Sequence, residues 1–124
     1  MNYLRIDDGE RTILHVRGEL DALSVTELRP LFDKVVDDGR RDVVVELSEL
    51  RLIDSSGVGA LVSLYKRVRG GGGQVQFTGV TAQPLVIFKL LRLDVVFELE
   101  PMRALVPAEQ SVETPPPSIR VVRP

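Results

Sequence analysis

The stretch LRLIDSSGVGAL, residues 50–61, decides the fold of this chain. Leu52 and Ile53 are typical of the end of a buried strand, and residues 58–61 are typical of the start of a helix. An acid, two hydroxyl side chains and a glycine separate the two, as Asp54-Ser55-Ser56-Gly57. Because a strand that passes directly into a helix is the building unit of α/β folds, the stretch predicts an α/β protein with a polar strand-to-helix turn.

The segments that precede this turn predict a hairpin and then a helix. Residues 3–7 and 12–18 are strand-like and flank Asp8-Gly9, a dipeptide that favours hairpin turns. Apolar residues at helical spacing follow and share one face: Val25, Leu28, Leu31, Phe32, Val35 and Val36. We therefore expect a β-hairpin followed by an amphipathic helix.

The start of that helix has two possible positions. Ser24 with Glu27 predicts a capping box, and Gly39 predicts the end of the helix. A helix capped by Ser24 places Pro30 in its interior, where the proline ring clashes with a carbonyl group and kinks the helix. A start near Thr26 would instead bring Pro30 into the tolerant first turn. Both starts stay open at this point.

The remaining segments alternate between strand and helix. Residues 43–47 are rich in β-branched side chains, which is typical of a central strand covered on both faces. After the polar turn we expect, in chain order, a helix over 58–68, a strand over 74–78, a helix over 81–91 and a short strand over 95–99. Leu64 lies off the apolar face of its helix, and either a partner or a neighbouring helix could cover it.

This order, ββαβαβαβ, predicts an α/β sandwich. Each βαβ step requires parallel pairing with a right-handed crossover, whereas the initial hairpin is antiparallel. The expected sheet is therefore mixed and mostly parallel, with four to five strands, and it is accompanied by three or four helices.

Composition narrows the function classes. The chain has 124 residues, 44% of them hydrophobic and 27% charged, as in an ordinary globular domain. A net charge of -2 gives no electrostatic reason to expect direct nucleic-acid binding, and no cysteine is present to ligate a metal. The first ten residues do not resemble a secretory signal, and no apolar run reaches the roughly 18 residues of a membrane span. We expect a cytoplasmic protein without membrane insertion, metal or cofactor.

Proline content divides the chain into two parts. Six of the eight prolines lie between Pro101 and the end of the sequence. Residues 115–117 are all proline and can continue neither a helix nor a sheet. We therefore expect one domain over residues 1–106 and a flexible proline-rich tail over residues 107–124.

The polar turn supports three interpretations. As a helix N-cap it needs only one of its polar residues. As a nucleophile, a serine needs a base, but His15 is the single histidine, and the G-x-S-x-G elbow of hydrolases is absent. As a phosphoryl acceptor, a serine at a helix N-terminus gains about -1.5 to -2 charges that the helix end tolerates. The size and the unpaired charge of the phosphoryl group would then disrupt the contact with a partner that packs on the neutral serine. We therefore favour an interaction protein over an enzyme.

Two motifs closely resemble a known family. GELD at residues 18–21 and LIDSSGVGAL at residues 52–61 are similar to the STAS domains of bacterial anti-sigma factor antagonists. The passage KRVRGGGGQVQFTGV, residues 66–80, resembles the glycine-rich entry to the family's next strand, and residues 85–93 resemble its third helix with a buried Phe88. The resemblance covers residues 2–100 and implies the STAS fold.

The resemblance also implies a phosphorylation switch. Such antagonists bind an anti-sigma factor that is itself a GHKL-type serine kinase, and thereby free a sigma factor for transcription. The kinase phosphorylates the serine after the motif aspartate, here Ser55, and a PP2C-type phosphatase reverses this step. The motif match implies further partner-binding residues: Glu19, Asp21, Asp54, Ser56, Gly57, Val58 and Gly59. An alternative within the same fold is a STAS module of another system, such as a lipid-transporter subunit or a signalling scaffold.

Overall fold

The predicted hairpin opens the structure, a computed structural model that describes residues 2–97. Strands β1 (Tyr3–Asp8) and β2 (Arg11–Val16) pair antiparallel, with Ile6 opposite Ile13. Gly9 has a φ of 62° in the turn between them, a left-handed conformation that glycine adopts without strain. The hairpin prediction is confirmed.

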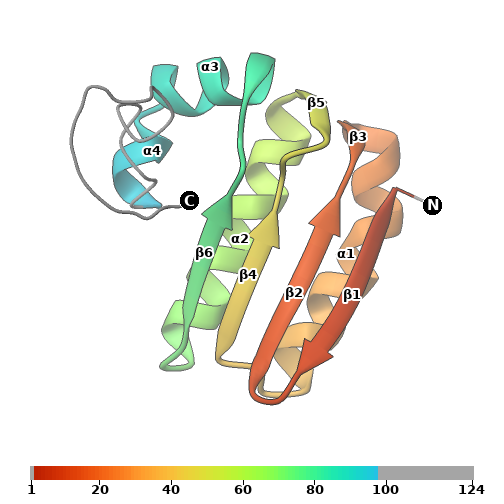
Figure 1. Ribbon diagram of the computed structural model, residues 1–124, viewed down its shortest axis with the longest axis vertical. Helices are drawn as coiled ribbons and strands as arrows, with labels where there is room; N and C mark the ends of the chain where they lie inside the picture. Colours follow the sequence, from red (N-terminus) through yellow and green to blue (C-terminus); the bar gives the residue numbers. More distant parts are fainter. Residues whose placement is uncertain (1, 98–124) are drawn as a thin grey trace, which may run out of the picture.

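Four strands form the main sheet, in the order β1-β2-β4-β6. Strand β4 (Asp42–Glu46) pairs parallel with β2 on one side and with β6 (Gln74–Thr78) on the other. Helices α1 (Ala22–Asp37) and α2 (Ser55–Gly70) lie together on one face of this sheet (Figure 1). The structure therefore confirms a mixed, mostly parallel α/β fold.

The core fills the space between the sheet and these two helices. Along β4, Val43 and Val45 are fully buried, whereas Val44 is only half-buried. The expectation that β4 is covered on both faces is therefore wrong, because α1 and α2 occupy the same side of the sheet (Figure 1). Leu64 is buried in the core, so neighbouring elements of this chain cover it.

A second, two-stranded sheet positions both strand-to-helix turns. Strands β3 (Gly18–Leu20) and β5 (Leu50–Ile53) pair parallel, with Leu20 opposite Ile53. Each strand is followed, after a single residue, by a helix. Ile53 is buried as expected, but Leu52 is 48% exposed, because β5 pairs in this small sheet and not within the main one.

The first helix begins earlier than both expected positions. Asp21 is its N-cap, and the Asp21 carboxylate accepts a hydrogen bond from the Ser24 N–H at 2.9 Å. The Ser24 hydroxyl accepts in turn from the Asp21 N–H at 2.8 Å. This reciprocal pair of hydrogen bonds satisfies two backbone N–H groups and forms a capping box. The cap lies three residues before the expected one, so the predicted pairing of Ser24 with Glu27 is wrong. Pro30 consequently lies inside α1, where it is exposed.

The strand expected over residues 95–99 is replaced by a helix. Helix α3 (Ala82–Leu90) is followed by the short helix α4 (Leu93–Val96), and residues 98 and 99 lie outside the described residues. Leu93 and Phe97 are both buried, whereas the two valines between them are exposed. A helix places Leu93 and Phe97 on one face and turns Val95 away from it, whereas a strand would place residue 95 on the same face as both. The helix therefore lets the two side chains reach the core while Val95 stays exposed.

The domain boundary expected at residue 106 and the tail expected over residues 107–124 lie outside the described residues. Both remain predictions. Within residues 2–97, no helix combines the length and the apolar character that crossing a membrane requires.

Acid is expected to destabilise the fold through two carboxylates that pair with Arg5 of the hairpin, Asp7 and Asp38 at the end of α1. Hydrogen bonds from Arg5 and from the buried Thr12 hydroxyl lower the pKa of the Asp7 carboxyl below its ordinary value of 3.8. Lys34 and then Arg5 lower the pKa of Asp38. Because the folded pKa values lie below the unfolded ones, this stabilisation is complete above the unfolded pKa and is lost as the pH falls through the folded pKa. We expect the urea midpoint to fall between about pH 5 and pH 2, and to fall less in Asp7→Asn. Identical pH profiles for both proteins would contradict this assignment.

Candidate functional site

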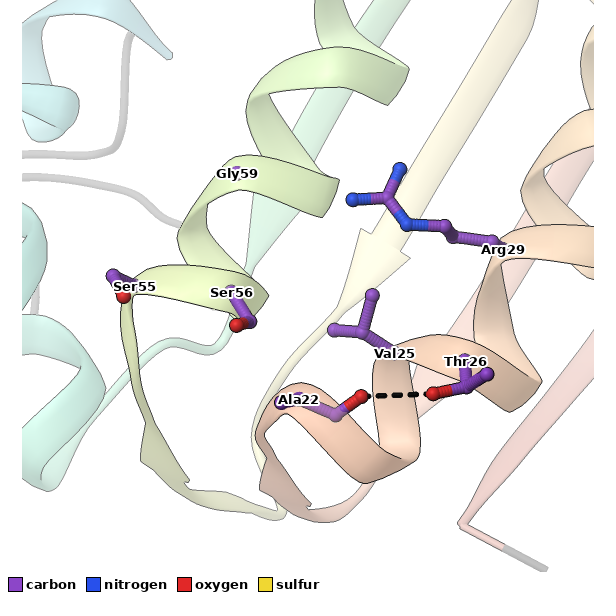
Figure 2. Close-up of a pocket in the computed structure, with 7 residues that line it drawn as sticks. All are labelled: Ala22, Val25, Thr26, Arg29, Ser55, Ser56 and Gly59. Atoms are coloured by element: carbon purple, nitrogen blue, oxygen red, sulfur yellow. Dashed lines mark hydrogen bonds between the residues drawn. The ribbon is translucent and has the colours of Figure 1, made fainter.

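The two strand-to-helix turns lie side by side because β3 pairs with β5. The N–H of Asp54 donates to the carbonyl oxygen of Leu20 at 3.1 Å, which extends the contact between the strands into the second turn. Asp21 and Asp54 have similar extended backbones, with φ values of -125° and -114°, and each caps the helix that follows. The N-terminal turns of α1 and α2 are thereby brought next to each other (Figure 2).

Asp54 confirms the N-cap interpretation of the polar turn. Its Oδ1 accepts a hydrogen bond from the Gly57 N–H at 3.1 Å. The cap does not use the neighbouring serines, and within the described residues the hydroxyls of Ser55 and Ser56 have no hydrogen-bond partner. In the adjacent turn, hydrogen bonds from Ser24 lower the pKa of the Asp21 carboxyl, which favours its charged, capping form. Both serine hydroxyls therefore remain available for other contacts.

The absence of a side chain at Gly57 allows the turn before α2 to pack closely against the turn before α1. A Cβ atom at this position would overlap the carbonyl oxygen of Leu20 and would lie 2.7 Å from Cγ1 of Ile53. Gly59 differs, because among the described residues a Cβ atom there would have no heavy atom within 4 Å apart from its chain neighbours and the backbone of its own helix. The first glycine is thus required for close packing, whereas the second leaves open space beside the helix.

A groove runs between the first turns of the two helices, and we refer to it as the α1–α2 groove. It is lined by Ala22, Val25, Thr26 and Arg29 of α1 and by Ser55, Ser56 and Gly59 of α2 (Figure 2). Its volume is about 450 Å³, which is within the usual size range of ligand sites, but it is open to solvent. This shape suits side chains inserted by another protein better than an enclosed small molecule.

The predicted site residues separate into three groups. Ser55, Ser56 and Gly59 line the groove. Asp21 and Asp54 hold the helix ends beside it. The others lie around these turns: Gly57 is buried, Val58 packs half-buried against the core, and Glu19 is exposed in β3.

The comparison with protein families identifies this arrangement. A family model described as "Mlab, STAS domain" matches residues 6–106. The chain belongs to the STAS domain family. This STAS domain is 31% identical over 78 residues to the anti-sigma-B factor antagonist of Staphylococcus aureus, and the match covers 63% of this chain and 72% of that protein. The predicted family is confirmed, and the chain is an anti-sigma factor antagonist-like STAS protein.

Solved structures confirm the fold of the STAS domain. An anti-sigma factor antagonist from Mycobacterium paratuberculosis matches with a TM-score of 0.72 and 24% identity, over 80% of this chain and 84% of that one. The Bacillus cell fate determinant SpoIIAA, solved in its phosphorylated form, matches with a TM-score of 0.63 and 19% identity, over 75% of this chain and 86% of that one. At these identities the likeness shows a shared fold.

The α1 wall of the groove and one residue of α3 are absent from the sequence-based prediction of the site. Arg29 lines the groove opposite the serines, and the helical spacing of residues 22, 25, 26 and 29 is a signal that could have indicated it. Gln83 of α3 binds both backbone groups of Ile53, with its Oε1 accepting from the N–H at 2.9 Å and its Nε2 donating to the carbonyl at 3.0 Å. No local pattern signals this contact, because its partners lie thirty residues apart.

The position of the histidine disfavours a nucleophilic serine in this STAS domain. His15 lies in β2 between the buried Leu14 and Val16, so its side chain points to the sheet face opposite the helices. Ser55 begins α2 on the other side of the sheet (Figure 1). In the part of the chain from residue 2 to residue 97, no three acidic or histidine side chains converge as metal ligands.

Proposed function

We propose that this STAS domain is an anti-sigma factor antagonist whose partner binding is switched by phosphorylation of Ser55. In its unmodified form it would bind an anti-sigma factor that is a GHKL-type serine kinase, and so release a sigma factor in the cytoplasm. One observation carries the proposal: Ser55 is exposed, lines the α1–α2 groove and has a hydroxyl without a hydrogen-bond partner among the described residues.

Phosphorylation would change the groove and leave the fold in place. The kinase transfers the γ-phosphoryl group of ATP to Oγ of Ser55, with release of ADP and of the hydroxyl proton. Asp54, not Ser55, caps α2, so the helix keeps its cap. The new group adds about -1.5 to -2 charges at a helix end that favours anions. A partner surface fitted to the bare hydroxyl then meets bulk and charge, until a PP2C-type phosphatase removes the phosphoryl group.

Two comparisons support this proposal. The Staphylococcus aureus relative is named an anti-sigma-B factor antagonist, and its match covers most of its length. SpoIIAA shares the fold and has been solved in a phosphorylated form. A binding protein of this kind needs no general base beside Ser55, which agrees with the position of His15.

Mass spectrometry of the phosphorylated chain tests the acceptor. We expect incubation with ATP and the cognate anti-sigma kinase to add a single phosphoryl group, on the peptide that contains Ser55. Ser55→Ala should abolish the modification, and the matched variant Ser56→Ala should retain it. Modification of Ser56 alone, or failure of every serine kinase encoded beside the organism's sigma factors to modify the chain, would reject the proposed switch in favour of a STAS module of another system.

A further inference from the structure

Among the described residues, Arg29 is a cation without a partner, and it stands on the wall of the α1–α2 groove. Within residues 2–97 it forms no ion pair or hydrogen bond, whereas Arg5, Arg11, Arg40 and Arg67 each pair with an aspartate. Figure 2 shows its side chain extending from α1 toward the first turns of α2. The other residues that line the groove are uncharged. An exposed guanidinium in this position can bind an anion that enters the groove.

The opposite wall offers room for such an anion. Ser55 and Ser56 stand on that wall, and the space beside Gly59 is free of heavy atoms within 4 Å of an added Cβ. The nearby hydroxyl of Thr26 donates to the Ala22 carbonyl at 2.9 Å, and among the described residues it accepts no hydrogen bond from Arg29. The residues that line the groove include one cation, Arg29, and no carboxylate, so a phosphoryl group that turns into the groove from this wall has a single cationic partner there.

We propose that Arg29 binds the phosphoryl group of phosphorylated Ser55 across the α1–α2 groove. The planar guanidinium can donate two parallel hydrogen bonds to phosphoryl oxygens, which a lysine cannot reproduce. In the unmodified protein the same guanidinium is free for an acidic side chain of the partner, so modification of Ser55 withdraws it from the interface. This inference rests on the proposed function, because it assumes that Ser55 is the acceptor.

A phosphorus NMR titration tests the contact without a kinase. The full chain is made with phosphoserine incorporated at position 55 during translation, and its ³¹P chemical shift is followed from pH 4 to pH 8 (on either side of the second phosphate pKa of about 6). A bound guanidinium stabilises the dianion, so Arg29→Gln is expected to raise that pKa by about 0.5 unit. Arg29→Lys should recover part of the shift. Lys66→Gln removes an equal charge from the exposed side of α2, outside the groove, and should leave the pKa within about 0.1 unit.

Two outcomes would overturn the proposal. In one, Arg29→Gln titrates like the unsubstituted protein. In the other, Lys66→Gln shifts the pKa as much as Arg29→Gln does, which would indicate a general effect of charge. Because translation supplies the phosphoryl group, neither outcome depends on whether a kinase recognises Ser55, and the mass-spectrometric assay decides that question separately.

Discussion

Gly57→Ala is expected to lower the free energy of unfolding by about 3 kcal/mol, at the upper end of the usual cost of overpacking a core. The added methyl group would overlap the carbonyl oxygen of Leu20 and approach the side chain of Ile53. Leu20 cannot move aside freely, because its carbonyl accepts a hydrogen bond from the N–H of Asp54 and β3 is paired with β5. Urea denaturation at neutral pH measures the change.

Gly59→Ala is the matched control for this prediction. It makes the same chemical change in the same helix, but within residues 2–97 the new methyl group meets no heavy atom within 4 Å beyond its own stretch of helix. Alanine has a helix propensity about 0.5–1 kcal/mol more favourable than glycine, so this variant should be more stable than the original protein. If the two substitutions changed stability equally, the close approach of α2 to β3 would not be what requires Gly57.

Ser55→Asp is expected to weaken binding of the anti-sigma factor by about 100-fold, which corresponds to about 2.7 kcal/mol. The substitution places a carboxylate on the groove wall, where a partner fitted to a neutral hydroxyl cannot pair it. Thermal stability should change little, because the residue is exposed and a negative charge suits the first turn of a helix. Isothermal titration with the purified partner and thermal unfolding of the free chain measure the two effects.

Two variants at the same position separate charge from size. Ser55→Asn has nearly the volume of the aspartate variant but no charge, and we expect it to lose less than one third of that binding free energy. Ser55→Ala should bind as the original protein does and should no longer respond to the kinase. If the aspartate and alanine variants bound the partner with equal affinity, Ser55 would not be the residue that switches binding.

Local sequence patterns predicted most of the fold. The hairpin and the parallel strands follow from turn dipeptides and apolar spacing, which act between near neighbours. Capping preferences indicated a cap within the polar turn, and the structure shows that Asp54 provides it. Two of the errors occur where a local pattern competes with another signal. Ser24 fits both as the N-cap of α1 and as the N3 residue of a helix capped by Asp21. The structure shows that the second arrangement forms. At Leu93 and Phe97, burial against the core overrides the strand propensity of the valines between them.

The candidate site was predictable on one side only. Ser55, Ser56 and Gly59 follow one another within a turn of α2, so a single motif places them together. Arg29 reaches the same groove from α1, and Gln83 reaches β5 from α3, through contacts between segments distant in sequence. Which helix faces which is set by the pairing of β3 with β5, a tertiary feature that no short motif encodes.

The turn that carries Ser55 is held from three directions, by the Asp54 cap, by the contact of Gly57 with Leu20 and by the amide of Gln83. A segment anchored in this way has little freedom to rearrange when one exposed atom gains a substituent. The backbones of the modified and bare proteins should therefore superpose, and the signal should pass to the partner through the added bulk and the local electric field of the new group, not through a movement of the backbone. Such a field is screened over about 8 Å at physiological ionic strength, so only a protein in direct contact with this corner can sense the difference.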